Sequence, residues 1–431
     1  MDIDTNTDRA ARLNEAHTLM LAFARDTGLE PQSDRPRRYL WTDAFAVCTL
    51  FTLAKAFDAP QLAQLALRLI DQVHQVLGHF APQDTRSGPL SGLDAEQARL
   101  HPTLGGLRIG KKELERGPHE PYDAQREWDR DGQYFHYLTK WMHALERAAV
   151  HTGDETYLRY AVELAQTAFA AFTVGAKDAG PVRMVWKMSV DLTRPLVPSM
   201  GQHDPLDALV TFSELRFCAH TRFANTALPD LEHFPKSGNR FSDKEVRLNK
   251  QVERGFDSIK TENALDEQIS TAALMCEDMA LDTTDPLGLG GLLFDAVRSV
   301  QMSVHERFDW PGLTPALLAA ATRGIPAFLA QNALHAPASV RLAFRELGLA
   351  IGLHGEPAMR TALEAHPQDF ANAAQLRQQL EDLQHFLPLA RTLEDFWMHP
   401  QNRTAPSWSE HQDINTVTLA TALAPDDFLT I

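Results

Sequence analysis

Carboxylates that could transfer protons stand near the starts of predicted helices in this chain. Asp129 and Asp131 lie two residues apart beside Trp128. Paired carboxylates can hydrolyse a glycosidic bond, because one protonates the leaving oxygen while the other acts as base or nucleophile. Neighbouring positions alone do not provide the separation of roughly 5–10 Å that this mechanism requires. We therefore expect one of them to work with a carboxylate from another helix. Candidates for that partner are Asp43, Asp204 and Glu410.

Two histidines offer a second acid–base chemistry. His203 directly precedes Asp204, and His411 lies two residues before Asp413. An imidazole titrates near neutral pH, so one histidine can act as base while the other acts as acid. The same side chains could instead cap helices or hydrogen-bond within the protein, as many helix-start residues do. His203 and His411 are thus alternative catalytic residues to Asp131, Asp129 and Asp43.

Aromatic and charged side chains near these positions suggest a ligand of matching chemistry. Trp41, Trp128 and Trp408 could each stack on a sugar ring, although each could equally be a core residue. Lys187 and Arg194 could bind a carboxylate, phosphate or sulfate, or form salt bridges within their loop. Asp204, Glu410 and Asp413 could accept hydrogen bonds from sugar hydroxyls. The ligand expected from this set is a small-molecule carbohydrate or an anionic sugar.

The elements that would position these residues are helices that alternate between two kinds. Segments that are apolar all round follow segments with one charged face, as expected for inner and outer layers. The twelve predicted segments are 10–25, 40–57, 61–77, 132–149, 157–172, 206–219, 265–281, 287–304, 314–334, 338–353, 371–397 (one helix or two) and 414–423. Six polar tips precede the inner segments, and Asp, Ser, Thr and Pro suit a first helical turn. We therefore expect an all-α, single-domain (α/α)6 toroid over residues 1–431, with the tips around one mouth.

This alternation resembles the six-hairpin toroid shared by many glycoside hydrolases and by the N-acylglucosamine and cellobiose 2-epimerases. The closest local likeness runs from Gly132–Leu138 through Thr152–Leu158, an apolar helix, a Gly-Asp turn and a Tyr-led outer helix. The resemblance implies a carbohydrate-active enzyme. For the epimerases it implies two histidines that exchange a proton at the carbon next to a carbonyl. His203 and His411 begin the third and sixth inner helices, where they could face each other across a ring.

Two long connections, 79–131 and 173–203, interrupt the alternation, and both lead into inner helices. The first holds many glycines and prolines, and within the second residues 183–191 alternate like a short β-strand. Loops of this length in compact proteins are usually functional or disordered. We expect both connections to cover the mouth. A third connection, about 225–262, is strongly charged and is expected to be a solvated flap.

The composition restricts the classes of partner. A net charge of -16 argues against nucleic-acid binding, because there is no basic stripe to displace counterions from phosphates. No window is long and apolar enough for a membrane span, and the N-terminus lacks a secretory signal. Three separated cysteines in apolar segments suit a reducing compartment, so we expect a cytoplasmic protein. We expect no metal and no cofactor, since no ligand spacing stands out. A homodimer is one assembly that this sequence allows.

Three functions remain open from the sequence. The first is a glycoside hydrolase that uses Asp131 or Asp129 with a second carboxylate. The second is a sugar 2-epimerase or isomerase that uses His203 and His411. The third is a non-catalytic toroidal scaffold that binds a ligand or a protein.

Overall fold

The computed structural model describes residues 2–175, 182–199, 201, 203–223, 265–277, 279–304 and 308–431, without the side chains of residues 2–6 and 333. The fold is mostly helical, with 65% helix and 4% strand. This confirms the predicted all-α class. The described residues do not form a closed barrel, so the toroid stays a prediction. The predicted flap at 225–262 lies outside the described residues.

The chain divides into two compact units, each of which is described by itself. The first unit contains Met1–Arg37, Thr42–Ile70 and Met279–Ile431, and the second contains Arg38–Trp41 and Asp71–Asp278. Helices α2 (Leu40–Ala56) and α3 (Pro60–Leu77) carry residues of both units.

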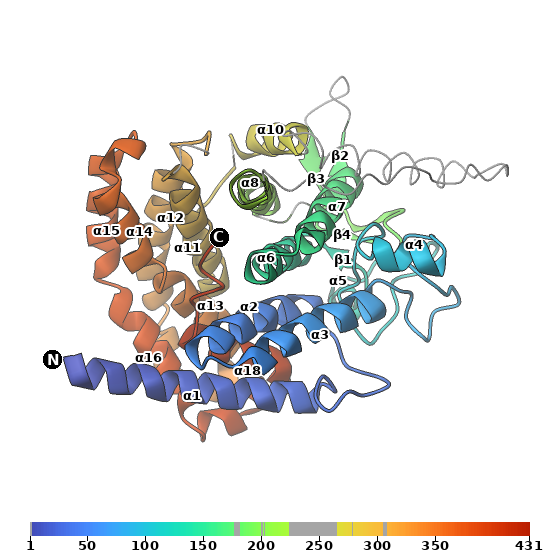
Figure 1. Ribbon diagram of the computed structural model, residues 1–431, viewed down its shortest axis with the longest axis horizontal. Helices are drawn as coiled ribbons and strands as arrows, with labels where there is room; N and C mark the ends of the chain where they lie inside the picture. Colours follow the sequence, from blue (N-terminus) through green and yellow to red (C-terminus); the bar gives the residue numbers. More distant parts are fainter. Residues whose placement is uncertain are drawn as a thin grey trace. The chain divides into compact units, whose positions relative to one another are not determined.

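The second unit consists of long helices and two small sheets (Figure 1). Its further elements are α4 (Ala95–Leu100), α5 (Ala124–Asp129), β1 (Gln133–Tyr134), α6 (Phe135–Thr152), α7 (Glu155–Phe172), β2 (Thr173–Val174), β3 (Arg183–Met184), β4 (Lys187–Met188), β5 (Pro195–Val197), α8 (Asp204–Arg222) and α10 (Asp266–Cys276). The predicted hairpin of α6 and α7 is confirmed. Gly153 adopts the left-handed conformation after α6, with φ 69°, and the Asp154 carboxylate accepts from the Thr156 N–H at the start of α7.

Helices α6 and α8 pack side by side and run in the same direction. His136 pairs with Asp204, Lys140 with Asp207 one turn later, and His143 with Glu214 further along both helices. The residue numbers of the partners increase along both helices, as they do only when two helices are parallel. A row of polar side chains therefore fills much of the α6–α8 interface.

A three-stranded antiparallel sheet joins the two long connections. Strand β4 lies between β1 and β5, with Tyr134 opposite Lys187 and Lys187 opposite Val197. A second pair, β2 and β3, places Thr173 opposite Met184. The strand signal predicted at 183–191 is thus divided between two short strands. The sheet places Gln133 and Tyr134, just after the first connection, against the middle of the second.

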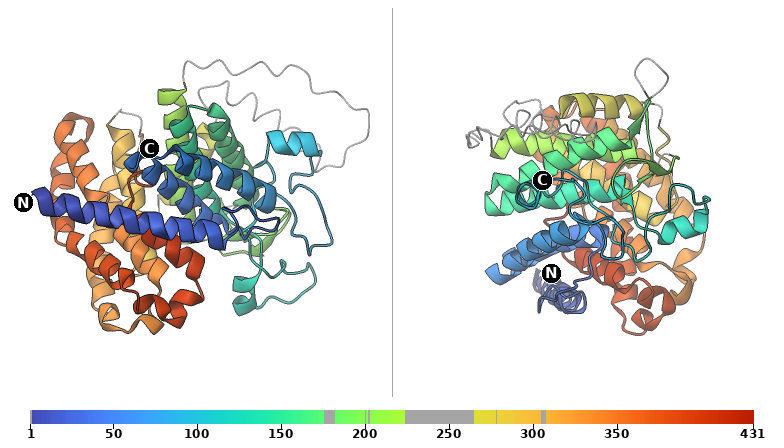
Figure 2. Two further views of the ribbon diagram at one scale, coloured as in Figure 1. Left: turned by 60° about the horizontal axis from the view of Figure 1, so that its bottom comes forward. Right: turned by 90° about the vertical axis from the view of Figure 1, so that its right-hand side faces the viewer.

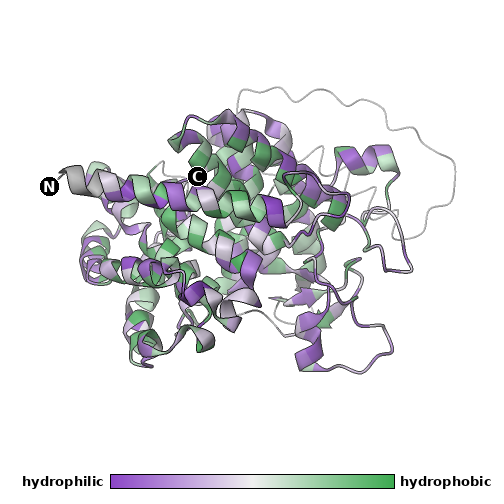
Figure 3. Ribbon diagram, turned by 90° about the horizontal axis from the view of Figure 1, so that it is seen from below, coloured by the Kyte–Doolittle hydropathy of each residue, from purple (hydrophilic) through white to green (hydrophobic). Residues whose placement is uncertain are grey.

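The first unit contains the remaining helices, which Figure 2 shows from two further sides, with α1 in blue and the others in yellow to red. They are α1 (Asp2–Asp26), α11 (Pro286–Ser303), α12 (Leu313–Leu329), α13 (Ala343–Leu353), α14 (Glu356–Ala365), α15 (Ala373–Gln384), α16 (Leu387–Met398), α17 (Pro406–Ser409) and α18 (Gln412–Leu423). The predicted segment 371–397 is two helices, and α14 is a helix that the periodicity did not predict. In Figure 3, α1 carries hydrophilic and hydrophobic residues in turn, as an outer helix should.

Glycines let α11 and α13 approach closely. A Cβ added to Gly290 would clash with the carbonyl oxygen of Gly348, and one added to Gly352 would lie 2.9 Å from the Cβ of Leu293. These contacts again rise together along both helices, so α11 and α13 are parallel. The polar tip before the predicted segment 287–304 includes Asp285, which caps α11, since its carboxylate accepts from the Gly288 N–H at 3.1 Å. None of the described helices is long and apolar enough to cross a membrane.

Replacing Gly290 by alanine tests this close approach. We expect Gly290→Ala to lower the free energy of unfolding by about 1–3 kcal/mol, because the methyl group overpacks the contact with α13. Gly291→Ala is the matched control, since a Cβ at Gly291 meets nothing within 4 Å. It should be neutral or stabilising by up to about 1 kcal/mol, as expected for a helical glycine. Urea unfolding of both variants gives the comparison, and equal stabilities would contradict the close packing.

Candidate active site

Aromatic rings gather around Tyr134 in the second unit, where β1 leads into α6. The Tyr134 ring stacks on Trp186, with centroids 5.1 Å apart, and on His136 at 5.4 Å. Trp128 meets Trp186 edge to face at 4.9 Å. Tyr137 meets Tyr134 at 5.2 Å. Tyr134 is buried, whereas Trp186, His136 and Tyr137 are half-buried and Trp128 is exposed. The rings thus offer a partly accessible apolar surface with polar edges, as sugar-binding sites do.

A hydroxyl pair extends the cluster on one side. The hydroxyl groups of Tyr39 and Tyr137 lie 2.9 Å apart. Burial is the main reason that the pKa of Tyr39 rises to about 12. Burial likewise raises the pKa of Tyr134. The buried Tyr134 hydroxyl has no hydrogen-bond partner among the described residues. Both phenols are therefore protonated at neutral pH and can hydrogen-bond a ligand.

A histidine and a carboxylate form the acid–base pair of this region. His136 Nδ1, at the start of α6, lies 3.6 Å from Oδ1 of Asp204, at the start of α8. Burial raises the pKa of Asp204, and contact with His136 lowers it in part. The ring of His136 is half-buried among the aromatic rings, so its other nitrogen can meet a ligand. A carboxylate that orients one imidazole nitrogen leaves the other free to take or give a proton.

His203, the residue before Asp204, also carries a nitrogen that could take part. It occupies the N-cap position of α8 but makes no side-chain capping hydrogen bond. Its Nε2 atom is buried and has no partner among the described residues. A buried imidazole nitrogen normally finds a hydrogen-bond partner, so this atom has an unused hydrogen-bonding capacity among the described residues.

Lys111 brings a cation to the aromatic rings. Its ammonium group lies 5.6 Å from the ring centre of Tyr134 and 6.0 Å from that of Trp128. Burial, with a smaller contribution from the nearby Lys187, lowers the pKa of Lys111 to about 8. The described residues give this ammonium group no hydrogen-bond acceptor. It can therefore bind a carbonyl oxygen or an anionic group of a ligand.

Asp131 holds the chain beneath this region in place. Its carboxylate accepts from the Arg108 guanidinium and from the backbone N–H groups of Gly110, at 3.0 Å, and Lys111, at 3.3 Å. Gly110 has a φ of +96°, and an added Cβ would clash with the Arg38 carbonyl. The Asp131 carboxylate is buried and fully engaged. Asp131 therefore supports the backbone of Lys111. Asp129, two residues earlier, is exposed.

Lys187 ties the two long connections together. Its ammonium group is completely buried and donates to the carbonyl oxygens of Glu127, at 2.7 Å, and Arg130, at 2.9 Å. It also pairs with the Glu127 carboxylate at 3.1 Å. Arg194 donates to the carbonyl oxygen of Arg116. Both cations predicted to bind a ligand thus make contacts within the protein.

The remaining predicted site residues are divided between the core and the surface. Trp41 and Asp43, in the first turn of α2, are both buried. Trp408 is buried against Trp397, with ring centroids 5.8 Å apart. Glu410 is exposed.

The predicted site residues His411 and Asp413 lie at the start of α18. His411, at its N-cap position, contacts the ring of Phe344 at 5.6 Å. Asp413 forms a salt bridge of 3.2 Å with Arg37.

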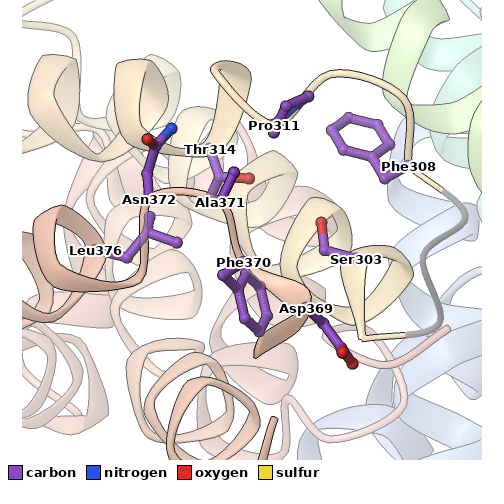
Figure 4. Close-up of a pocket in the computed structure, with 9 residues that line it drawn as sticks. All are labelled: Ser303, Phe308, Pro311, Thr314, Asp369, Phe370, Ala371, Asn372 and Leu376. Carbon is purple, nitrogen blue, oxygen red and sulfur yellow. The ribbon is translucent and has the colours of Figure 1, made fainter. Parts of the chain in front are cut away.

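A pocket of about 190 Å³ opens elsewhere in the first unit (Figure 4). Phe308 and Phe370 line it together with Thr314 and Asn372. Among the described residues that line it, Asp369 is the one acidic residue. The His136–Asp204 pair brings two titratable groups together, as an acid–base reaction needs, so we place the candidate active site in the second unit.

The residues that the sequence reasoning missed are His136, Lys111 and Tyr134. His136 and Tyr134 both lie within Gly132–Leu138, the segment on which the likeness to six-hairpin proteins rests. Lys111 follows a glycine-rich stretch, which could have indicated a backbone that approaches a ligand. Comparison of the chain with known proteins finds no matching family model, no matching curated protein and no matching solved structure.

The two predicted catalytic aspartates should differ sharply when mutated. We expect Asp131→Asn to lower the free energy of unfolding by about 3–5 kcal/mol, because the buried Arg108 guanidinium loses its counter-charge. Asp129→Asn, two residues away and exposed, should change it by less than about 0.5 kcal/mol. Thermal and urea unfolding measure both effects. Parental stability in Asp131→Asn would contradict the supporting role of Asp131.

Proposed function

We propose that the chain is a sugar-processing acid–base enzyme of the epimerase or isomerase type. The observation that carries this proposal is the His136–Asp204 pair beside the aromatic rings of Tyr134 and Trp186. Stacking surfaces suit the apolar faces of a sugar, and an imidazole with a carboxylate partner suits proton transfer near neutral pH.

The proposed reaction moves one proton at the carbon next to a carbonyl group. His136 removes that proton, and the electron pair of the C–H bond moves into the carbonyl to form an enolate. Lys111, as an ammonium ion, stabilises the enolate oxygen by charge. Return of a proton from His136 or His203 to either face of the carbon gives back the sugar or its epimer. Asp204 stabilises the imidazolium of His136 while it holds the proton.

The geometry favours this chemistry over glycoside hydrolysis in the second unit. Hydrolysis needs two carboxylates that are free to act as acid and base. Asp131 is engaged by Arg108 and two backbone N–H groups. Asp204 faces the imidazole of His136.

The same proposal includes the toroid. A ring of six hairpins is built from parallel inner helices, each connected to the next by an antiparallel outer helix. The parallel pairs α6–α8 and α11–α13, and the return of the chain through α7 after α6, support that arrangement. We also infer a cytoplasmic location, which buried thiols such as Cys48 and Cys218 suit.

Solvent deuterium tests the reaction whatever sugar is formed as product. The full chain is incubated in D2O with single aldoses, ketoses, N-acylated amino sugars and uronic acids. NMR then shows whether deuterium enters the carbon next to the carbonyl. We expect exchange with at least one sugar, and His136→Ala and Asp204→Asn should each slow it by about 100-fold or more. His399→Ala, which removes a histidine of the first unit, is the matched control.

Other outcomes of this experiment have a definite meaning. Release of reducing ends from oligosaccharides without C–H exchange would overturn the proposal in favour of a hydrolase. Neither exchange nor hydrolysis with any sugar would favour the non-catalytic scaffold.

The role of Lys111 predicts a pH dependence. The exchange rate should fall as the pH rises through about 8, because the ammonium group with the lowered pKa then loses its charge. Lys111→Arg should retain the rate at higher pH, since a guanidinium stays charged. Lys111→Met should be slow at every pH, and the exposed neighbour Lys112→Met should keep the parental profile. A parental profile in Lys111→Met would refute this role.

A further inference from the structure

Three metal-ligand side chains meet in the core of the second unit. His143 and Glu146 lie one turn apart on α6, and Glu214 faces them from α8. One ligand atom of each lies within 4.8 Å of the others. All three side chains are buried, with relative exposures of 0%, 1% and 0%. His143 Nδ1 and Glu214 Oε1 are 2.6 Å apart.

A thiol lies beside this group. Cys218 follows Glu214 by one helical turn on α8 and hydrogen-bonds Glu146. The thiol is buried, and its surroundings raise its pKa well above the ordinary value, mainly through burial and then through Glu146. Each helix therefore contributes two ligand-type residues at helical spacing, so that both project into one interface.

We propose that His143, Glu146 and Glu214 bind a zinc ion between α6 and α8, with the Cys218 sulfur as the fourth ligand. Imidazole nitrogen, carboxylate oxygen and thiolate sulfur are the ligands that zinc takes in proteins, usually four in a tetrahedron. Ligand atoms on such an ion, at about 2.0–2.3 Å from the metal, lie roughly 3.3 Å apart. The three atoms lie within 4.8 Å of one another, so small side-chain movements would bring them to that spacing.

The charges of the described side chains balance with the ion. Arg147 pairs with both oxygens of Glu146, and each carboxylate oxygen keeps a second lone pair for a metal. With zinc, the ion and Arg147 offset the two carboxylates and the Cys218 thiolate. Zinc would replace the proton of the Cys218 thiol, so binding should release a proton.

Metal content of the purified full-length chain tests the site. After treatment with a chelator and dialysis, the protein is incubated with ZnCl2, dialysed again and analysed for zinc. We expect one ion per chain, and Glu214→Gln and His143→Gln should each weaken binding at least about tenfold. With CoCl2, a tetrahedral site that includes sulfur should give an intense visible spectrum and a thiolate-to-cobalt band, and Cys218→Ser should remove that band.

The buried His101–Glu163 pair provides the matched control. Its atoms lie 2.8 Å apart beside Arg159, and it belongs to no group of three ligands among the described residues. Glu163→Gln should therefore keep the zinc content of the parent. Equal zinc content in Glu163→Gln and Glu214→Gln, or a parent that retains none, would overturn the proposal. Should Glu214→Gln fail to fold, the cobalt spectrum and proton release of the parent decide the matter alone.

Discussion

The polar row between α6 and α8 is the constraint on which the second unit depends. Charged side chains lose their hydration in a core, and the loss is offset only when partners are placed well. His136 with Asp204, Lys140 with Asp207 and His143 with Glu214 satisfy that condition at three levels. A slip of either helix by one residue would separate all three pairs at once. The row therefore fixes the register of α6 against α8 more strictly than apolar packing would.

The candidate site inherits its geometry from this register. His136 and Asp204 stand at the first level of the row, where both helices begin. Lys111 reaches the same region on a loop that the Asp131 carboxylate holds through its backbone N–H. Lys187 fixes the end of α5 and so holds Trp128 near Trp186. Each accessible group thus rests on a buried ion pair or hydrogen bond.

The sequence predicted the helices well because their signals are local. Gly153 and Asp154 marked the turn between α6 and α7 correctly, and Asp285 marked the start of α11. Helix α14 escaped because it is short and its segment, with Gly355 and Pro357, reads as a connection. No local sequence signal could show that Asp131 forms a buried ion pair. Its partner Arg108 lies 23 residues earlier, so sequence spacing cannot distinguish a buried counter-ion from a catalytic acid.

The bonds of Lys187 also bear on the order in which the chain folds. They join residues 60 positions apart, whereas the α6–α7 hairpin closes through a single turn. Long-range contacts must overcome the entropy of closing a loop before they contribute stability, so local hairpins form first. The helices of the second unit can thus be present before the segments that carry Lys111 and Trp186 are joined. A folding intermediate at that stage would have nearly the full helix content of the second unit but would lack the assembled candidate active site.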